Sequence, residues 1–244
     1  MRRFRPPRGG PRPHGASSIE AVPARIFVLA GVNGAGKSSV GGAALSSRNV
    51  PWFNPDLAAR ELRDANPGMS ADAADGHAWE IGRKGLERAL AGGLNFAFET
   101  TLGARTIPDL LLAGARAGAQ VHVWYAGLAS PELHIARVKS RTTAGGHDIP
   151  DQKIHDRYSA SRANLIKLLP HLASLRVYDN SVDADPKTGH RPQPALLLQM
   201  EDGRIVTHIA LGRVPQWAKP VLAAAIDADR ARGGSLVQPK DAGS

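Results

Sequence analysis

The chain has 244 residues, of which 42% are hydrophobic and 22% charged, the balance of one ordinary globular domain. It contains no cysteine, which excludes disulfides, cysteine-ligated zinc and thiol nucleophiles. No apolar run reaches the roughly 18 residues that a membrane span needs, and the basic first residues lead into prolines and glycines rather than into a signal peptide. We therefore expect a cytoplasmic protein without membrane contact.

The net charge of +9 is concentrated at the N-terminus. The first 25 residues hold six arginines and one acid, so they carry +5 of it. Residues 1–22 are rich in Arg, Pro and Gly and cannot bury enough apolar surface to offset ordering entropy, which predicts a disordered basic tail. Such a tail could anchor nucleic acid or an acidic membrane, or be a solvated extension. We expect no other contact with nucleic acid.

In chain order, apolar runs alternate with helical segments from residue 23 onward, a pattern typical of a mostly parallel sheet flanked by helices. We predict strands over 25–30, 95–99, 120–128 and 175–178, with a short apolar element at 52–53. Helices are predicted over 37–47, 55–63, 70–92 and 106–117, from 130–131 onward, and over 151–169. The fold class is therefore α/β.

The C-terminal part has a different pattern. Residues 183–194 are polar and proline-rich, and two apolar runs, 195–200 and 204–209, then flank the turn signal Glu201-Asp202-Gly203. This predicts a small antiparallel hairpin appended to the parallel sheet, followed by a helix over 219–231. Residues 23–232 are predicted to form one domain, with a frayed end over 233–244.

The strongest chemical signal is the sequence GVNGAGKS over residues 31–38, which fits the Walker A pattern and lies between a predicted strand and a predicted helix. In such P-loops the backbone amides surround phosphate oxygens at the positive end of the helix. Lys37 would reach the β- and γ-phosphates of ATP, and the Ser38 hydroxyl would coordinate Mg²⁺. The predicted ATP-binding residues are Gly31, Asn33, Gly34, Ala35, Gly36, Lys37, Ser38 and Ser39.

The residues after the P-loop favour a kinase. The guanine-reading Asn-Lys-x-Asp motif of GTPases is absent, as is a long apolar strand ending in the paired acids of motor ATPases. A small-molecule kinase needs an acid that orients or deprotonates the acceptor hydroxyl. Asp56 follows the short apolar element at 52–53, where the end of a second strand would reach the phosphate crevice, and is the candidate base. The alternative is an acid that complements the start of a helix.

Glu99 ends the predicted strand at 95–99, so we expect it to face the substrate; the alternative is a strand-end acid bonded to nearby backbone. Arg137, Arg141 and Arg157 lie on the helices around Gly145-Gly146. They could close over the phosphates as a lid, or be solvated helix surface.

Other side chains have simpler explanations. His147 and His155 are eight residues apart, which does not bring both to one helical face, and no acid completes a metal site. Trp79, Trp124 and Tyr158 are interpreted as core or crevice packing rather than as base-stacking platforms.

Taken together, these motifs resemble the zeta toxins and zeta-toxin-like kinases over about residues 25–182. The resemblance includes the FETTL stretch at 98–102 and a block that begins with Arg137-Val138. The matching segments, in the family's order, are GVNGAGKSS (31–39), NPD (54–56), FETTL (98–102), RV (137–138) with Arg141, GGHDIP (145–150), RY (157–158) with Ser161 and Asn164-Leu165, and YDNS (178–181).

This resemblance implies an ATP-dependent kinase that phosphorylates a sugar hydroxyl of UDP-N-acetylglucosamine, and that is usually held inactive by an antitoxin protein. It implies Lys37 and Ser38 as ligands of ATP and magnesium, Asp56 as catalytic base, and Glu99 with Thr100 as substrate contacts. Among the arginines it implies catalytic charges at Arg141 and Arg157, and we add Arg137 as a substrate contact.

Two alternatives stay open at this point. One is a small-molecule or nucleotide kinase with another acceptor. The other is a nucleic-acid-binding ATPase that uses the arginine-rich tail.

Overall fold

The computed structural model describes residues 22–46, 52–143, 149–182 and 193–234. These residues contain a seven-stranded sheet in the order β2-β3-β1-β4-β5-β6-β7. The first five strands in the chain pair in parallel, and β6 and β7 are antiparallel, which confirms the predicted α/β class. The strands are β1 (Arg25–Ala30), β2 (Trp52–Phe53), β3 (Phe96–Thr100), β4 (Gln120–Gly127), β5 (Ser174–Asp179), β6 (Ala195–Glu201) and β7 (Arg204–His208).

The helices lie where the apolar periodicity predicts them, with ends that differ by one or two residues. The Ser70 hydroxyl accepts a hydrogen bond from the amide of Ala73 at 3.2 Å and so caps its helix as predicted. No helix in the described parts of the chain is long and apolar enough to cross a membrane. The helices are α1 (Lys37–Ser46), α2 (Pro55–Ala65), α3 (Ala71–Gly92), α4 (Thr106–Arg116), α5 (Pro131–Thr143), α6 (Asp151–Leu168) and α7 (Lys219–Ala231).

Several predicted segments lie outside the described residues. They are the basic tail up to residue 21, the Gly145-Gly146 turn with His147, most of the polar stretch 183–194, and the C-terminal end from residue 235. The predictions for these segments stay predictions.

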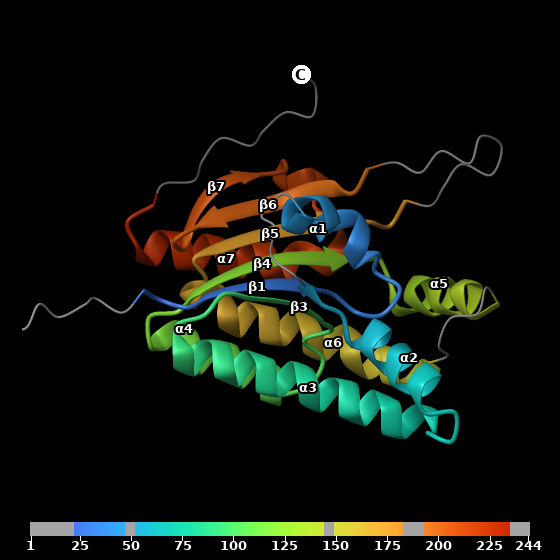
Figure 1. The fold of residues 1–244 in the computed structure, drawn as a ribbon. Helices are drawn as coiled ribbons and strands as arrows, with labels where there is room; N and C mark the ends of the chain where they lie inside the picture. The colour runs from blue at the N-terminus through green and yellow to red at the C-terminus, as the bar shows by residue number, and fades with distance from the viewer. Residues whose placement is uncertain (1–21, 47–51, 144–148, 183–192, 235–244) are drawn as a thin grey trace, which may run out of the picture.

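The two faces of the sheet are covered differently. In Figure 1, α3, α4, α6 and α7 lie on one side of the strands and α1 on the other. Side chains alternate accordingly: Ile26 and Val28 of β1 belong to the large core, whereas Phe27 and Leu29 pack with Val40 on the α1 side. A sheet buried on both faces explains why the β1 sequence is apolar without interruption.

The C-terminal hairpin extends the main sheet. The predicted antiparallel hairpin is confirmed, and β6 joins the sheet by pairing with β5 over Ser174–Asp179; Leu197, Leu198 and Met200 belong to the large core. The reason is that β5 would otherwise present an unpaired edge, which the antiparallel strands cover.

The topology places the site. Central β1 pairs in parallel with both β3 and β4, so the carboxyl ends of these three strands meet at one edge of the sheet. Figure 1 shows α2 and α5 beyond that edge. In open α/β sheets, ligands bind in the crevice outside the carboxyl ends, where the strand order reverses.

A close contact at this edge yields a stability prediction. A Cβ at Gly127, the last residue of β4, would lie 2.3 Å from a ring carbon of Trp217, so Gly127→Ala should destabilise the fold by about 1–3 kcal/mol through overpacking. Gly76→Ala, at an exposed position of α3 with no atom near the new methyl, should instead stabilise by about 1 kcal/mol. Urea unfolding measures the change in the free energy of unfolding for both variants. Equal changes in the two variants would contradict the prediction.

Candidate active site

The Walker A residues form a tight loop between β1 and α1. Gly34 and Gly36 have φ angles of 82° and 75°, which side chains other than glycine rarely adopt. A Cβ at Gly36 would also lie 2.3 Å from the amide nitrogen of Asn180. Ser38 and Ser39 are exposed in the first turn of α1. This geometry suits backbone amides that close around a phosphate at a helix N-terminus.

The back of the loop is held by the end of β5. The Asn180 side chain donates a hydrogen bond to the Ala35 carbonyl at 2.9 Å, and Arg137 of α5 donates to the Asn180 carbonyl at 2.8 Å. Arg137 donates further to the carbonyl of Val182. Arg137, predicted as a substrate contact, therefore lies against the support of the phosphate loop and does not line the cavity described below.

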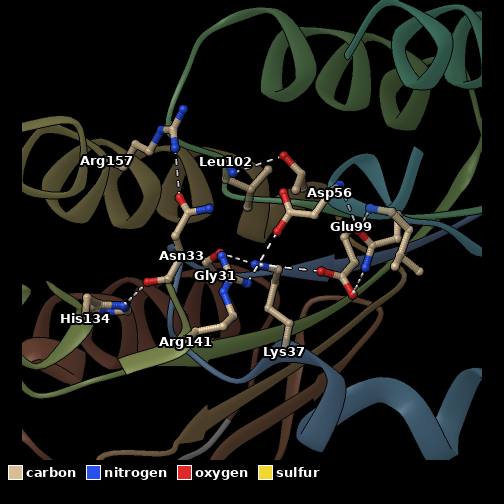
Figure 2. A network of polar contacts seen from close by, with 12 residues as sticks. Gly31, Asn33, Lys37, Asp56, Glu99, Leu102, His134, Arg141 and Arg157 are labelled. Carbon is tan, nitrogen blue, oxygen red and sulfur yellow. Dashed lines mark hydrogen bonds and ion pairs between the residues drawn. The ribbon is translucent and has the colours of Figure 1, made fainter. Parts of the chain in front are cut away.

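Asn33 joins the front of the loop to two helices. Its carbonyl accepts a hydrogen bond from Nδ1 of His134 in α5, and its Oδ1 accepts one from Arg157 of α6, both at 2.8 Å (Figure 2). Because a carbonyl only accepts, the proton of His134 is on Nδ1. The P-loop is thus fixed by side chains that lie far from it in the sequence.

Two oppositely charged groups meet at the loop. The Lys37 ammonium donates to the Gly31 carbonyl at 3.2 Å and lies 3.8 Å from a carboxylate oxygen of Glu99. The other Glu99 oxygen accepts from the Asn54 side chain at 3.1 Å, and only 9% of the Glu99 side chain is exposed. Burial raises the pKa of Glu99, and nearby Lys37 opposes that rise. Glu99 thus contacts the side chains of Lys37 and Asn54.

Asp56 is both a helix-start residue and a cavity residue. It is the second residue of α2, and its amide donates to the capping Asn54 side chain at 2.9 Å. Its carboxylate lines the cavity and lies 3.5 Å from the guanidinium of Arg141 in α5. Both side chains of this ion pair are about half exposed, so the pair adds little stability and stays accessible.

The loop after β3 forms one cavity wall in an unusual conformation. Leu102 has a φ of 52°, rare for a residue other than glycine, yet its side chain is buried. Asn164 of α6 donates to the carbonyls of Leu102 and Ala104 at 2.7 and 3.0 Å, and Ser161 donates to the Thr101 carbonyl. The Thr100 hydroxyl accepts from the Leu102 amide, which fixes it in the wall. Such strain persists only where neighbours hold it, often at functional sites.

These elements surround a cavity of about 480 Å³, within the range of small-molecule sites. Its lining combines apolar side chains with acids from α2, α3 and β3 and cations from α3 and α6. The lining residues include Asn33, Phe53, Asp56, Asp72, Asp75, Trp79, Arg83, Phe98, Glu99, Thr100, Leu102, Ile107, Lys153 and Arg157.

The structure therefore brings most predicted site residues together. Lys37, Asp56, Glu99, Thr100 and Arg157 meet at the cavity or its P-loop end, and Arg141 reaches it through Asp56. Sequence analysis missed the roles of Asn180 and His134, which support the loop, and the cavity wall formed by α3. The sequence signals for Asn180 were its position at a strand end and its place in the YDNS segment (178–181) of the family resemblance, whereas His134 had none.

The residues fit the expected magnesium ion in chemical type. The exposed Ser38 hydroxyl is a hard oxygen donor, as Mg²⁺ requires, and the cavity adds carboxylates. No cluster of three or more side chains that could hold a metal by themselves occurs in the described residues. Phosphates and water would complete the shell of a magnesium ion held by Ser38.

Fold and loop together define a P-loop protein of the kinase type. The sequence profile of the zeta toxin family matches residues 20–184, and the chain belongs to this family. An uncharacterized protein of Haemophilus influenzae is 28% identical over 137 residues, which cover 55% of this chain and 92% of that protein.

Solved structures share the fold at low sequence identity. The AvrRxo1-ORF1:AvrRxo1-ORF2 complex with sulphate ions matches with a TM-score of 0.55 and 15% identity, over 83% of this chain and 64% of that one. The same complex with ATP gives 0.55 and 14%, over 84% and 64%. A structure of the PezAT toxin-antitoxin system of Streptococcus pneumoniae gives 0.50 and 15%, over 90% of both chains. This chain thus spans less than two thirds of the matched chain in these two AvrRxo1 structures.

The buried His134 makes stability depend on pH. Burial lowers its pKa from 6.5 to about 4, so the unfolded chain binds a proton between these values and the folded chain does not. Stability should be fully present above pH 6.5 and should fall, by on the order of 2 kcal/mol, as the pH drops toward 4. Urea unfolding at several pH values measures the decrease. The free energy of unfolding should decrease less in His134→Asn, which keeps a hydrogen-bond donor, than in the wild type. In the exposed His155→Asn it should decrease as much as in the wild type. If the free energy of unfolding of His134→Asn depended on pH as steeply as that of the wild type, the role of His134 would be contradicted.

Asn180 should affect nucleotide binding selectively. Asn180→Ala removes the hydrogen bond to the Ala35 carbonyl, which should loosen the phosphate loop and weaken binding of ATP about tenfold, the effect of roughly 1.4 kcal/mol. Asn66→Ala, at the exposed end of α2, is the control. Calorimetric titration with an ATP analogue measures it, and unchanged affinity in Asn180→Ala would contradict the assigned support.

Proposed function

We propose that the chain is an ATP-dependent phosphotransferase that moves the γ-phosphate of ATP to a sugar hydroxyl of a nucleotide sugar, with UDP-N-acetylglucosamine as the acceptor. One observation carries the proposal: the carboxylates of Asp56 and Glu99 line the same cavity that meets the P-loop at Lys37. A cavity of this kind can hold an acceptor beside the phosphate to be transferred.

The P-loop side of the site holds the nucleotide. Backbone amides of the P-loop and the Lys37 ammonium would bind the β- and γ-phosphates, exchanging the present contacts of Lys37 for phosphate oxygens. Ser38 would hold a magnesium ion, which when bound offsets negative charge on the phosphates. Membership of the zeta toxin family and the likeness to a fold solved with ATP support this assignment.

The cavity side activates the acceptor. The Asp56 carboxylate would accept the proton of the attacking hydroxyl as its oxygen bonds to the γ-phosphorus. The bond from that phosphorus to the β-γ bridging oxygen breaks, and ADP leaves. Glu99 and Thr100 line the wall where acceptor hydroxyls would hydrogen-bond.

Two arginines are suited to balance the charge of the transferred group. Arg157 holds Asn33 of the P-loop and also lines the cavity, and Arg141 approaches it through its ion pair with Asp56. Guanidinium groups at these positions would stabilise charge on the equatorial phosphate oxygens.

An antitoxin protein is the proposed partner. Both solved relatives named above are two-component assemblies: AvrRxo1-ORF1 is bound to ORF2, and PezAT is a toxin-antitoxin system. These assemblies support an inhibitory partner protein for the present chain. Co-purification of such a partner with this chain from its source organism tests the proposal.

Replacing Asp56 separates chemistry from binding. Asp56→Asn should lower the rate of ADP release that depends on acceptor by about 10²–10⁴-fold, because the amide cannot take the proton, while ATP affinity stays within twofold. The control is Asp64→Asn, an exposed acid on the same helix outside the cavity. Full activity in Asp56→Asn would refute the role.

The acceptor is identified by mass spectrometry of the product formed with ATP, magnesium and a panel of nucleotide sugars, nucleosides and free sugars. Phosphorylated UDP-N-acetylglucosamine supports the proposal. If another acceptor is phosphorylated instead, the chain is still a kinase, but the proposed acceptor is wrong. A nucleic-acid-stimulated ATPase that requires residues 1–22, with no phosphorylated small molecule, would favour the tail-based alternative.

A further inference from the structure

The wall that α3 contributes to the cavity contains a tryptophan for which the reaction gives no role. Trp79 lines the cavity, and 45% of its surface is exposed. Large aromatic side chains are mostly buried on average, so an open indole on the wall of a ligand-sized cavity calls for an occupant. The sequence led us to interpret Trp79 as core or crevice packing, and the structure places it on a cavity wall with its ring open to a ligand.

The surroundings of Trp79 are rigid. The guanidinium carbon of Arg83, one helical turn further along α3, lies 5.9 Å from the centre of the indole ring. Arg83 is itself fixed by a bidentate pair with Glu80, at 2.6 and 2.9 Å, and by a contact with Glu87. A ring held beside a fixed cation loses little freedom when a ligand stacks on it.

The same cavity carries groups that suit the rest of a nucleotide. Lys153 of α6 brings positive charge, which matches a diphosphate. Asp72 and Asp75 of α3 bring acceptors for the N–H and O–H groups of a base or ribose. Asp56 and Glu99, at the P-loop end, are the groups proposed above for the sugar.

We propose that Trp79 is a stacking platform for a nucleobase of the acceptor, so that the enzyme selects acceptors in which a flat ring is joined to the sugar through a charged diphosphate. Free sugars are then poor substrates. This inference takes the identity of the acceptor from the proposed function. Binding of the base to Trp79 does not depend on phosphate transfer. Stacking of a base on an aromatic side chain is worth about 1–3 kcal/mol, which is about five- to 150-fold in affinity.

Binding of uridine diphosphate to protein saturated with a nonhydrolysable ATP analogue tests the platform directly. Trp79→Ala and Trp79→Leu should both weaken this binding by about tenfold, whereas Trp79→Phe should stay within about threefold. Leucine is the informative change, because it keeps apolar bulk without a ring. Ile81→Ala is the matched control: Ile81 lies on the same helix and is 49% exposed but does not line the cavity.

Steady-state kinetics give a second measure. Trp79→Leu should raise the KM for UDP-N-acetylglucosamine about tenfold, with kcat and the KM for ATP within about threefold, since the ring contributes to binding rather than to the reacting atoms. Activity with free N-acetylglucosamine should be low in the wild type and insensitive to Trp79.

The outcomes separate this inference from the proposed function. Unchanged binding of uridine diphosphate in Trp79→Leu, or no binding while another acceptor is phosphorylated, overturns the platform and leaves the kinase standing. Binding that depends on the ring, without phosphotransfer to any acceptor, supports the platform and overturns the kinase. Loss of binding in Ile81→Ala as well would mean that α3 acts through its stability, which also overturns the platform.

Discussion

The backbone turn between β1 and α1 is the constraint on which the site depends. With Gly34 and Gly36 in the left-handed region, the chain makes a tight turn directly before the N-terminus of α1. Ordering this turn costs conformational entropy, because glycine loses more backbone freedom on folding than other residues do. The protein offsets this cost with hydrogen bonds from outside the loop, at Asn33 and at the Ala35 carbonyl. The phosphate site is therefore a property of the whole sheet edge.

The same hydrogen bonds connect the phosphate loop to the neighbouring cavity. Arg157 holds the Asn33 side chain from α6 and also lines the cavity, so one guanidinium contacts both halves of the site. From the same helix, Asn164 holds the strained Leu102 loop at the cavity wall. A shift of α6 would thus move the phosphate loop and the Leu102 wall of the cavity together. In the proposed kinase, such coupling would make phosphate transfer depend on both substrates.

Charge in the site is balanced by pairs whose burial differs. The buried Lys37 and Glu99 compensate one another, and without its partner each would carry a large desolvation cost. The exposed Asp56 and Arg141 remain in contact with water and lose little when they separate. In the proposed reaction phosphate oxygens take the place of Glu99 beside Lys37, and the exposed pair separates at little cost when substrate binds. Trp79 on α3 lines the same cavity.

The sequence by itself determined the local elements and the phosphate loop, because their signals are local. The apolar run Arg25–Ala30, the glycine spacing of the loop and the Ser70 cap each act within a few residues. Asp56 and Glu99 were found because strand ends gather at one edge of a parallel sheet. Only the tertiary structure decided that Asn180 and Arg157 hold the loop, across 145 and 124 residues of sequence, and that the hairpin continues the sheet. Such contacts depend on side-chain directions that exist only after the helices have packed, so no local pattern encodes them.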